Sequence, residues 1–192
     1  MRIKQPIFSI IIPTYNRPKQ LDSCLHSLAR LDYSRDRFEA IVVDDGSEFP
    51  PETVVSRFRE SLDVSLITKP HEGPAAARNF GAKRAKGEFL AFIDDDCAPA
   101  PEWLQALVAQ FAITRNRAIG GLVINKLSDN PYSTASQLLI NYLSDYYNTN
   151  SHQAQILTSN NLTIPTDRFR AIGGFDITFP LAAGEDREFC DR

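Results

Sequence analysis

Three consecutive carboxylates, Asp94, Asp95 and Asp96, directly follow an apolar run at residues 89–93. Adjacent carboxylates repel one another, so their position beside a buried segment is unfavourable without a counter-charge. A hard divalent cation supplies that charge and takes oxygen ligands. Alternate residues at a strand end point to opposite sides, so we expect Asp94 and Asp96 to share a face while Asp95 points away. A solvated acidic turn is the alternative interpretation.

A second acidic pair, Asp44 and Asp45, follows another apolar run at residues 38–43 and leads into Gly46 and Ser47. A carboxylate at the end of a parallel strand can accept hydrogen bonds from a ribose hydroxyl or a base N–H. Because Asp, Gly and Ser are also common turn formers, a turn cap is the competing interpretation.

Three further charged residues lie in expected helices. Arg78 follows a helix start at Gly73 and Pro74, and its guanidinium could contact a diphosphate or form a surface salt bridge. Glu185 and Asp186 lie at another helix start, where acidic residues favour the helix dipole. A carboxylate there could also act as a general base that takes the proton of an acceptor hydroxyl.

Short apolar runs alternate with helical patterns along the first half of the chain. This order predicts βαβ units and a parallel sheet, and therefore an α/β fold. Ligands of such sheets bind beyond the carboxyl ends of the strands. The expected strands are 7–12, 38–43, 64–67 and 88–93, the expected helices are 18–31, 50–59, 74–86 and 101–114, and the polar loops at the strand ends are 14–17, 44–47 and 94–96.

The second half of the chain is less regular. We expect Gly87 to end the third helix of the first half as a C-terminal cap. Because the chain stops at Arg192, about two turns into its last helix, we expect a single domain over residues 1–192 that is cut short at its C-terminus. The elements expected here are strands at 118–127 and 155–164, a helix at 133–147, a turn at 173–176 and a helix from Glu185.

The composition is that of an ordinary globular protein. The 192 residues are 43% hydrophobic and 23% charged, and the net charge of -3 argues against a nucleic-acid binder. Three cysteines without a CxxC pair fit a reducing compartment better than a disulfide framework. The apolar stretch at 7–12 is too short for a signal-peptide core or a membrane span. These features predict a cytoplasmic location.

Five motifs follow one another between residues 7 and 190, nearly the whole chain. They are SIIIPTYNRP at 9–18, VVDDGS at 42–47, GPAAARN at 73–79, FIDDD at 92–96, and GGFD at 173–176 with GED at 184–186. This combination resembles family 2 glycosyltransferases with the GT-A fold. Each motif is degenerate alone, but five in register are not expected by chance.

The resemblance implies a nucleotide-diphosphate sugar donor, most commonly a UDP-sugar. Asp45 would contact the base, and Arg78 would steady the departing diphosphate. Asp96, with Asp94, would hold a divalent cation, Mn2+ or Mg2+, that bridges the diphosphate. The residues that would bind the nucleotide sugar are Pro13, Thr14, Tyr15, Asn16, Arg17, Asp44, Asp45, Arg78, Asp94 and Asp95.

For the transfer step, the resemblance implies one direct displacement with inversion of the anomeric centre. Asp186 would be the general base, and Glu185 would support it or contact the acceptor. The acceptor would be a glycan or a lipid-linked molecule, as in cell-wall or polysaccharide biosynthesis. Residues 1–100 would form the nucleotide-binding half and residues 101–192 the acceptor-side half.

Residues 138–147 carry apolar and aromatic side chains through an expected helix. Core packing is the plain interpretation. The other is a platform for the acceptor or a contact with a membrane surface, which would place the protein at the inner face of the membrane.

Four other classes compete with this interpretation. A phosphatase of the haloacid dehalogenase type carries its DxD after the first strand, usually followed by Thr, whereas Cys97 follows the triplet here, after the fourth. Nucleotidyltransferases and Rossmann dehydrogenases need a glycine-rich loop after the first strand, and residues 13–18 contain no glycine. A nucleotide-sugar-binding module without turnover would carry the same motifs.

Overall fold

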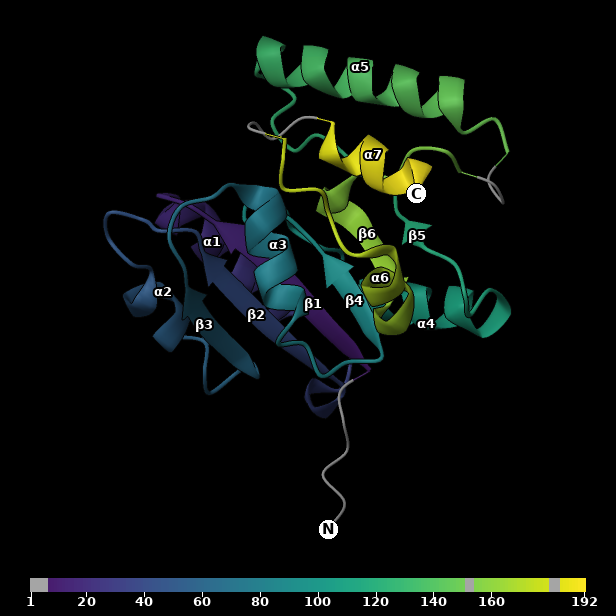
Figure 1. Ribbon diagram of the computed structural model, residues 1–192. Helices are drawn as coiled ribbons and strands as arrows, with labels where there is room; N and C mark the ends of the chain where they lie inside the picture. The colour runs from purple at the N-terminus through teal and green to yellow at the C-terminus, as the bar shows by residue number, and fades with distance from the viewer. Residues whose placement is uncertain (1–6, 151–153, 180–183) are drawn as a thin grey trace.

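The computed structural model describes residues 7–150, 154–179 and 184–192 and contains one central sheet flanked by helices (Figure 1). The strands are β1 (Phe8–Thr14), β2 (Phe38–Asp44), β3 (Val64–Thr68), β4 (Phe89–Phe92), β5 (Ile119–Gly120) and β6 (Leu162–Pro165). The α-helices are α1 (Pro18–Leu28), α2 (Glu52–Ser56), α3 (Pro74–Ala82), α4 (Trp103–Ile113), α5 (Pro131–Tyr147), α6 (Thr166–Ile172) and α7 (Glu185–Asp191). Two short 3-10 helices are η1 (Arg35–Arg37) and η2 (Ser159–Asn161).

The strands form one sheet in the order β3-β2-β1-β4-β6-β5. Strand β1 pairs in parallel with β2 and β4, and β2 pairs in parallel with β3. Strand β6 runs antiparallel to β4, and β5 runs antiparallel to β6. The predicted α/β fold with a mostly parallel sheet is confirmed. Because Thr14 and Asp44 are register partners, the loops after β1 and β2 leave the sheet side by side.

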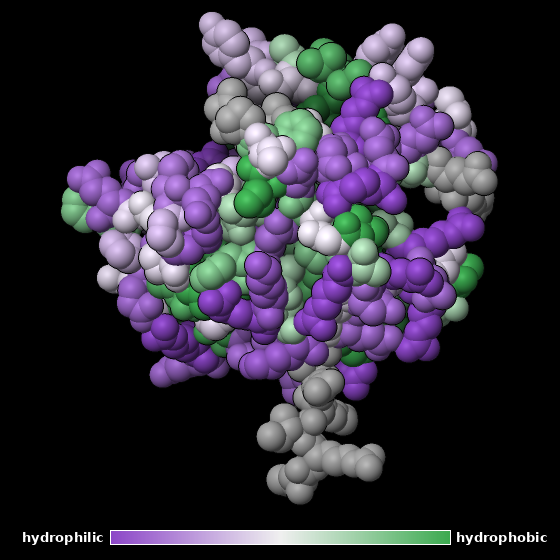
Figure 2. Space-filling view, viewed as in Figure 1, coloured by the Kyte–Doolittle hydropathy of each residue, from purple (hydrophilic) through white to green (hydrophobic). Residues whose placement is uncertain are grey.

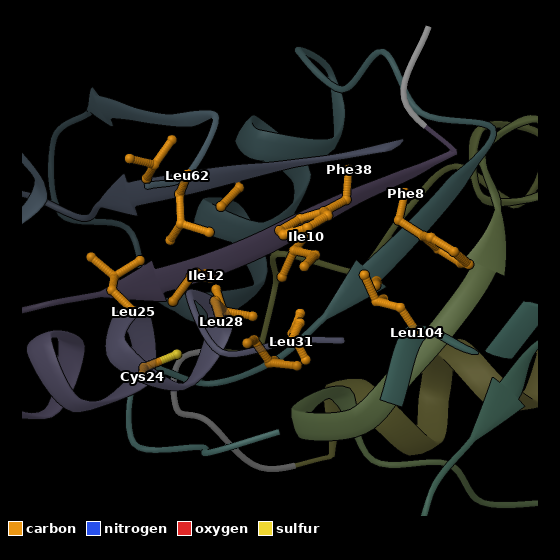
Figure 3. Close-up of a cluster of buried hydrophobic side chains, with 14 of the residues drawn as sticks. Phe8, Ile10, Ile12, Cys24, Leu25, Leu28, Leu31, Phe38, Leu62 and Leu104 are labelled. Atoms are coloured by element: carbon orange, nitrogen blue, oxygen red, sulfur yellow. The ribbon is translucent and has the colours of Figure 1, made fainter. Parts of the chain in front are cut away.

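The two faces of the sheet are buried under different helices. Ile10 and Ile12 of β1 pack in a cluster with side chains of α1, α2 and α4, part of which is shown in Figure 3. Ile11 points to the opposite face and packs with side chains of α3, α6 and α7. Burial on both faces explains why these strands are continuous apolar runs. The strands are therefore firm supports for the loops at their ends.

The strand predicted at 118–127 is wrong over most of its length, because β5 has only two residues. The N–H of the next residue, Gly121, donates to Asn161 O at 3.1 Å. Asn161 belongs to η2 and no longer to β6. The chain leaves the sheet there because, among the described residues, β6 pairs with β5 only at Ile119 and Gly120. For the same reason the strand predicted at 155–164 begins only at Leu162.

Gly87 is not the predicted helix cap. Helix α3 ends at Ala82, and its cap residue Lys83 has a right-handed conformation. Gly87 lies against β1 instead: its N–H donates to the Ser9 hydroxyl at 2.8 Å, and a Cβ at this position would lie 2.6 Å from Ser9 N. The glycine is therefore required by a close approach to the sheet. Helix α2 is also shorter than the predicted 50–59.

Candidate active site

The carboxyl ends of β1, β2 and β4 meet at one edge of the sheet (Figure 1). Thr14 ends β1, directly after the buried Pro13, and its hydroxyl donates to Asp95 Oδ2 at 2.7 Å. The Asp45 N–H donates to Thr14 O at 2.9 Å. These bonds tie the loops after the three strands together, at the edge where ligands of parallel sheets bind.

Arg17 neutralises two carboxylates of the triplet. Its Nη1 lies 2.9 Å from Asp95 Oδ1, and its Nη2 lies 2.9 Å from Asp96 Oδ2. Burial raises the pKa of Asp95, although the Thr14 hydroxyl and the Arg17 charge oppose the increase. Burial lowers the pKa of Arg17, but the charges of Asp95 and Asp96 outweigh it, and the net pKa is raised. The loop after β1 and the triplet are thus one electrostatic unit.

The carboxylates of the triplet are not arranged by strand alternation. Strand β4 ends at Phe92, the Ile93 N–H still donates to Ile11 O at 3.2 Å, and a turn follows in which the Cys97 N–H donates to Asp94 O at 3.1 Å. Asp94 faces a cation of its own, because Arg78 Nη2 donates to its Oδ1 at 2.7 Å. The argument from alternation fails because the turn begins before the triplet is complete.

Among the described residues, no group of three or more His, Cys, Asp or Glu side chains is arranged to hold a metal ion. The carboxylate oxygens of Asp94 and Asp96 do match the ligand preference of Mg2+ and Mn2+. Their side chains are 34% and 47% exposed, so both are accessible from solvent. Mg2+ is commonly held by one or two carboxylates plus substrate phosphates. The oxygen chemistry of the two carboxylates fits a cation shared with a phosphorylated ligand, although each is paired with an arginine, Asp94 with Arg78 and Asp96 with Arg17.

Asp45 is a buried carboxylate that organises the loop between β3 and α3. Its Oδ1 accepts a hydrogen bond from Lys69 Nζ at 2.8 Å, and its Oδ2 accepts one from the Gly73 N–H at 2.8 Å. His71 Nδ1 lies 2.9 Å from Oδ2. Burial lowers the pKa of Lys69, but hydrogen bonds to Asp45 and Glu72 raise it by more. Lys69 and Asp45 therefore form a buried ion pair at the sheet edge.

An aromatic pair lies beside this carboxylate. Tyr15 stacks on His71 with 4.1 Å between the ring centroids and 23° between the ring planes. Asn16, with a φ of 55°, links two loops, because its N–H donates to Ser47 Oγ and its Oδ1 accepts from the Glu48 N–H. The loop after β1 is thus held against the loop after β2, with the Tyr15 ring partly exposed.

Asp44 is completely buried at the end of β2. Its Oδ1 accepts a hydrogen bond from the Ser47 N–H at 3.0 Å, as a turn cap does. Its Oδ2 is buried and has no hydrogen-bond partner among the described residues. An unpartnered buried oxygen is unfavourable unless a ligand supplies the donor. Asp44 thus caps the turn with one oxygen, and its second oxygen is left without a donor among the described residues.

Glu185 and Asp186 begin α7 and face different partners. Glu185 is buried, and its Oε1 accepts from Arg78 Nη1 at 3.3 Å. Asp186 Oδ2 accepts from the Ser159 N–H at 3.0 Å. Asp186 Oδ1 is buried and has no hydrogen-bond partner among the described residues. Asp186 therefore holds one buried carboxylate oxygen at the start of α7 that has no hydrogen-bond donor among the described residues.

Asn79, the residue after Arg78 in α3, holds the GGFD segment. Its Nδ2 donates to Phe175 O at 2.7 Å, and its Oδ1 accepts from the Phe175 N–H at 2.9 Å. Gly174 has a φ of 78°, and a Cβ there would lie 2.5 Å from Asn79 Oδ1. Two motifs that lie far apart in the sequence are thus one structural unit.

Three residues at this edge were not among the predicted site residues. Lys69 and His71 follow β3. The expectation that ligands bind beyond the carboxyl ends of parallel strands applies to this strand too and points to both residues. Ser159 contributes its backbone N–H, for which the side-chain pattern holds no signal.

The sheet order and the acidic loops at its edge are those of a GT-A glycosyltransferase fold. The chain belongs to glycosyl transferase family 2, whose family model matches residues 9–172. Family membership confirms the predicted resemblance and excludes a phosphatase of the haloacid dehalogenase type.

Curated relatives and solved structures agree with this assignment. The validoxylamine A glucosyltransferase of Streptomyces hygroscopicus subsp. jinggangensis is 29% identical over 211 residues, which cover 95% of this chain and 50% of that protein. Glycosyltransferase AglE of Haloferax volcanii is 34% identical over 120 residues, which cover 62% of this chain and 40% of that protein. The chain thus spans half or less of the length of these relatives.

Two solved structures share the fold. A mannosyltransferase from Pyrobaculum calidifontis in complex with GDP-Man and Mn2+ has a TM-score of 0.75 at 22% identity, covering 97% of this chain and 51% of that chain. TarS of S. aureus in complex with UDP-GlcNAc has a TM-score of 0.73 at 24% identity, covering 95% of this chain and 52% of that chain.

Proposed function

We propose that this chain transfers a sugar from a nucleoside diphosphate sugar, first of all a UDP-sugar, to a hydroxyl group of a glycan or a lipid-linked acceptor. The observation that carries the proposal is the arrangement of three acidic groups around one edge of the sheet: the Asp44–Asp45 pair, the triplet at 94–96 and Asp186. Family membership supports the reaction class, and the two solved structures named above contain GDP-Man and UDP-GlcNAc.

In this proposal the nucleotide lies across the ends of β1 and β2. The loop at 13–17 wraps it, and the exposed Tyr15 ring offers a surface for stacking the base. The base lies next to Asp45, which the ion pair with Lys69 holds in place. A ribose hydroxyl would donate to the buried Oδ2 of Asp44 once the loop after β2 moves to admit it.

The sugar and the diphosphate lie near the triplet, with Asp95 and Asp94 on the sugar side. Asp96, together with Asp94, would hold Mn2+ or Mg2+ beside the diphosphate. Such an ion, when bound, stabilises the negative charge of the departing diphosphate. Arg17 brings a further positive charge to the same place, since it already lies between Asp95 and Asp96.

Asp186 acts as the base in the transfer step. Its Oδ1 takes the proton of the acceptor hydroxyl as that oxygen attacks the anomeric carbon. The bond from this carbon to the diphosphate oxygen breaks with the electron pair leaving on the diphosphate, so a single displacement inverts the centre. The Ser159 N–H, bound to Oδ2, keeps the carboxylate in one orientation.

Helix α5 forms the acceptor side of the proposed site. None of its residues is buried, and Leu138, Leu139, Tyr142 and Tyr146 are more than half exposed. Figure 2 shows hydrophobic side chains at the top of the molecule, where α5 lies. Within the described ranges, the helices are all too short or too polar to cross a bilayer. We place lipid-linked acceptors, and a peripheral membrane contact, at this helix.

Calorimetric titration with UDP, dTDP and GDP tests the donor assignment. We expect UDP to bind, at least about tenfold more tightly with Mn2+ than without it, because an ion shared with the phosphates adds ligand bonds to both. Equal affinity with and without Mn2+ would contradict the role of Asp96 and Asp94. A transfer assay on the same sample distinguishes an enzyme from a nucleotide-sugar-binding module.

Replacing Arg17 tests whether it is the counter-charge of the triplet. Without nucleotide, Arg17→Gln should bind Mn2+ about three- to tenfold more tightly, because Asp95 and Asp96 lose a partly exposed cation. Free Mn2+ is measured by electron paramagnetic resonance. The control is Arg57→Gln, whose arginine pairs with Asp22 on the surface at 2.6 Å. An unchanged or weaker Mn2+ affinity in Arg17→Gln alone would refute this role.

A further inference from the structure

A buried arginine joins the donor side of the proposed site to the helix that carries the proposed base. Arg78 is 4% exposed. Its Nη2 lies 2.7 Å from Asp94 Oδ1, and its Nη1 lies 3.3 Å from Glu185 Oε1. The Phe175 ring lies against the guanidinium, 5.7 Å from Cζ to the ring centroid. Arg78 therefore contacts the triplet, the GGFD segment and α7 at once.

We propose that Arg78 is a positioning residue that couples donor binding at Asp94 to the placement of Asp186 on α7. The inference rests on the proposed function, because it takes the donor to bind at the triplet and Asp186 to be the base. Glu185 connects Arg78 to Asp186, since it binds Arg78 and directly precedes Asp186 in the first turn of α7.

An arginine is required for this bridge. The guanidinium is planar and carries separate N–H donors, so it can bind two carboxylates that approach from different elements. A lysine ammonium is a point charge on a flexible stem and cannot hold both at a fixed separation. The side chains of Arg78 and Glu185 are 5% and 6% exposed, and among the described residues Arg78 is the cation paired with Glu185, while Arg78 is also paired with Asp94.

The contacts favour positioning over a direct contact with the diphosphate. Both terminal nitrogens of Arg78 already bind carboxylates, and its Nε is buried without a partner among the described residues. The guanidinium keeps further N–H donors, but because Arg78 is 4% exposed, a diphosphate could reach them only if neighbouring side chains moved. A shift of α7, in contrast, would move Asp186 directly, and a misplacement of about 1 Å can lower a rate about 100-fold.

Hydrogen exchange of the amides of residues 185–191, with and without UDP and Mn2+, tests the coupling. In the wild-type chain we expect UDP to slow this exchange at least about threefold, because an ordered Asp94 fixes Arg78 and hence α7. In Arg78→Met we expect UDP to bind within about threefold of the wild-type affinity but not to slow the exchange. Transfer should show a kcat lower by about 100-fold with little change in donor KM.

Three further variants complete the experiment. Arg84→Met is the control, because this exposed arginine lies over Phe80 and touches neither carboxylate of the bridge. It should behave as the wild type. Arg78→Lys should be intermediate between wild type and Arg78→Met. Glu185→Gln breaks the bridge with little change in volume, and it should reproduce the loss of coupling even if Arg78→Met fails to fold.

Each contrary result points to a different error. If the wild-type chain binds none of the three nucleotides, the proposed function fails and the inference fails with it. If UDP binds but slows the exchange of α7 equally in wild type, Arg78→Met and Glu185→Gln, the coupling alone is refuted. A UDP affinity more than about tenfold lower in Arg78→Met, with kcat unchanged, would assign Arg78 to the diphosphate instead.

Discussion

Asp186→Asn is expected to lower transfer by about 100- to 10,000-fold, the usual contribution of a general base. Asparagine has nearly the same shape, and its side-chain oxygen can still accept the Ser159 N–H bond that now reaches Asp186 Oδ2. It cannot take a proton from the acceptor hydroxyl. UDP affinity, measured by calorimetry, should stay within about threefold of wild type because no donor contact is assigned to Asp186.

Asp96→Ala serves as the matched comparison for this variant. It removes the proposed metal ligand and should weaken Mn2+-dependent UDP binding at least about tenfold, since the ion would lose a charged oxygen ligand. Equal loss of UDP binding in Asp186→Asn and Asp96→Ala would remove the basis for separating base from metal ligand. Full transfer activity in Asp186→Asn would remove Asp186 from the mechanism.

Asp45→Asn is expected to lower the free energy of unfolding by about 2–3 kcal/mol and to weaken UDP binding at least about tenfold. The substitution leaves the buried Lys69 ammonium facing a neutral amide. Breaking a fully buried ion pair usually costs about 3–5 kcal/mol, and the lower figure applies here because Glu72 still pairs with Lys69 at 2.8 Å. Urea denaturation measures the stability and calorimetry the affinity.

The control for Asp45→Asn is Asp22→Asn. Asp22 pairs with Arg57 at 2.6 Å on the surface, where an ion pair contributes at most about 1 kcal/mol. If the two variants lose the same stability, the Lys69–Asp45 pair does not hold the loop after β3. If Asp45→Asn loses stability but keeps UDP affinity, Asp45 organises the loop without contributing to nucleotide binding.

The parallel half of the fold was predictable because both faces of its strands are buried. Burial on both sides produces continuous apolar runs, and the runs at 7–12 and 38–43 match β1 and β2 to within two residues. The same topology predicts that Asp44, Asp45 and the triplet lie at one edge of the sheet. The position of these groups is therefore a property of strand order.

The antiparallel half was not predictable in this way. The apolar residues at 118–127 suggest a strand, but a strand also needs a partner, and β6 offers one over only two residues. Within the site, the pairing of Arg17 with Asp95 and Asp96 depends on a turn that strand periodicity does not describe. The bond from the Ser159 N–H depends on backbone placement alone. Local sequence patterns thus predict where the loops lie, whereas tertiary contacts determine which side chains form the ion pairs and hydrogen bonds of the site.

The long sequence distance across the Arg78 bridge has a consequence for how the protein is made. Arg78 and Glu185 are 107 positions apart, and Asn79 and Phe175 are 96 apart. Asp45 and Lys69 are only 24 apart. During synthesis from the N-terminus, the Asp45–Lys69 pair can form as soon as β3 and Lys69 have left the ribosome and the donor side is complete once the triplet follows, whereas the base joins it only after residue 186 has emerged. A nascent chain would therefore gain the means to hold a nucleotide well before it gains the means to use one.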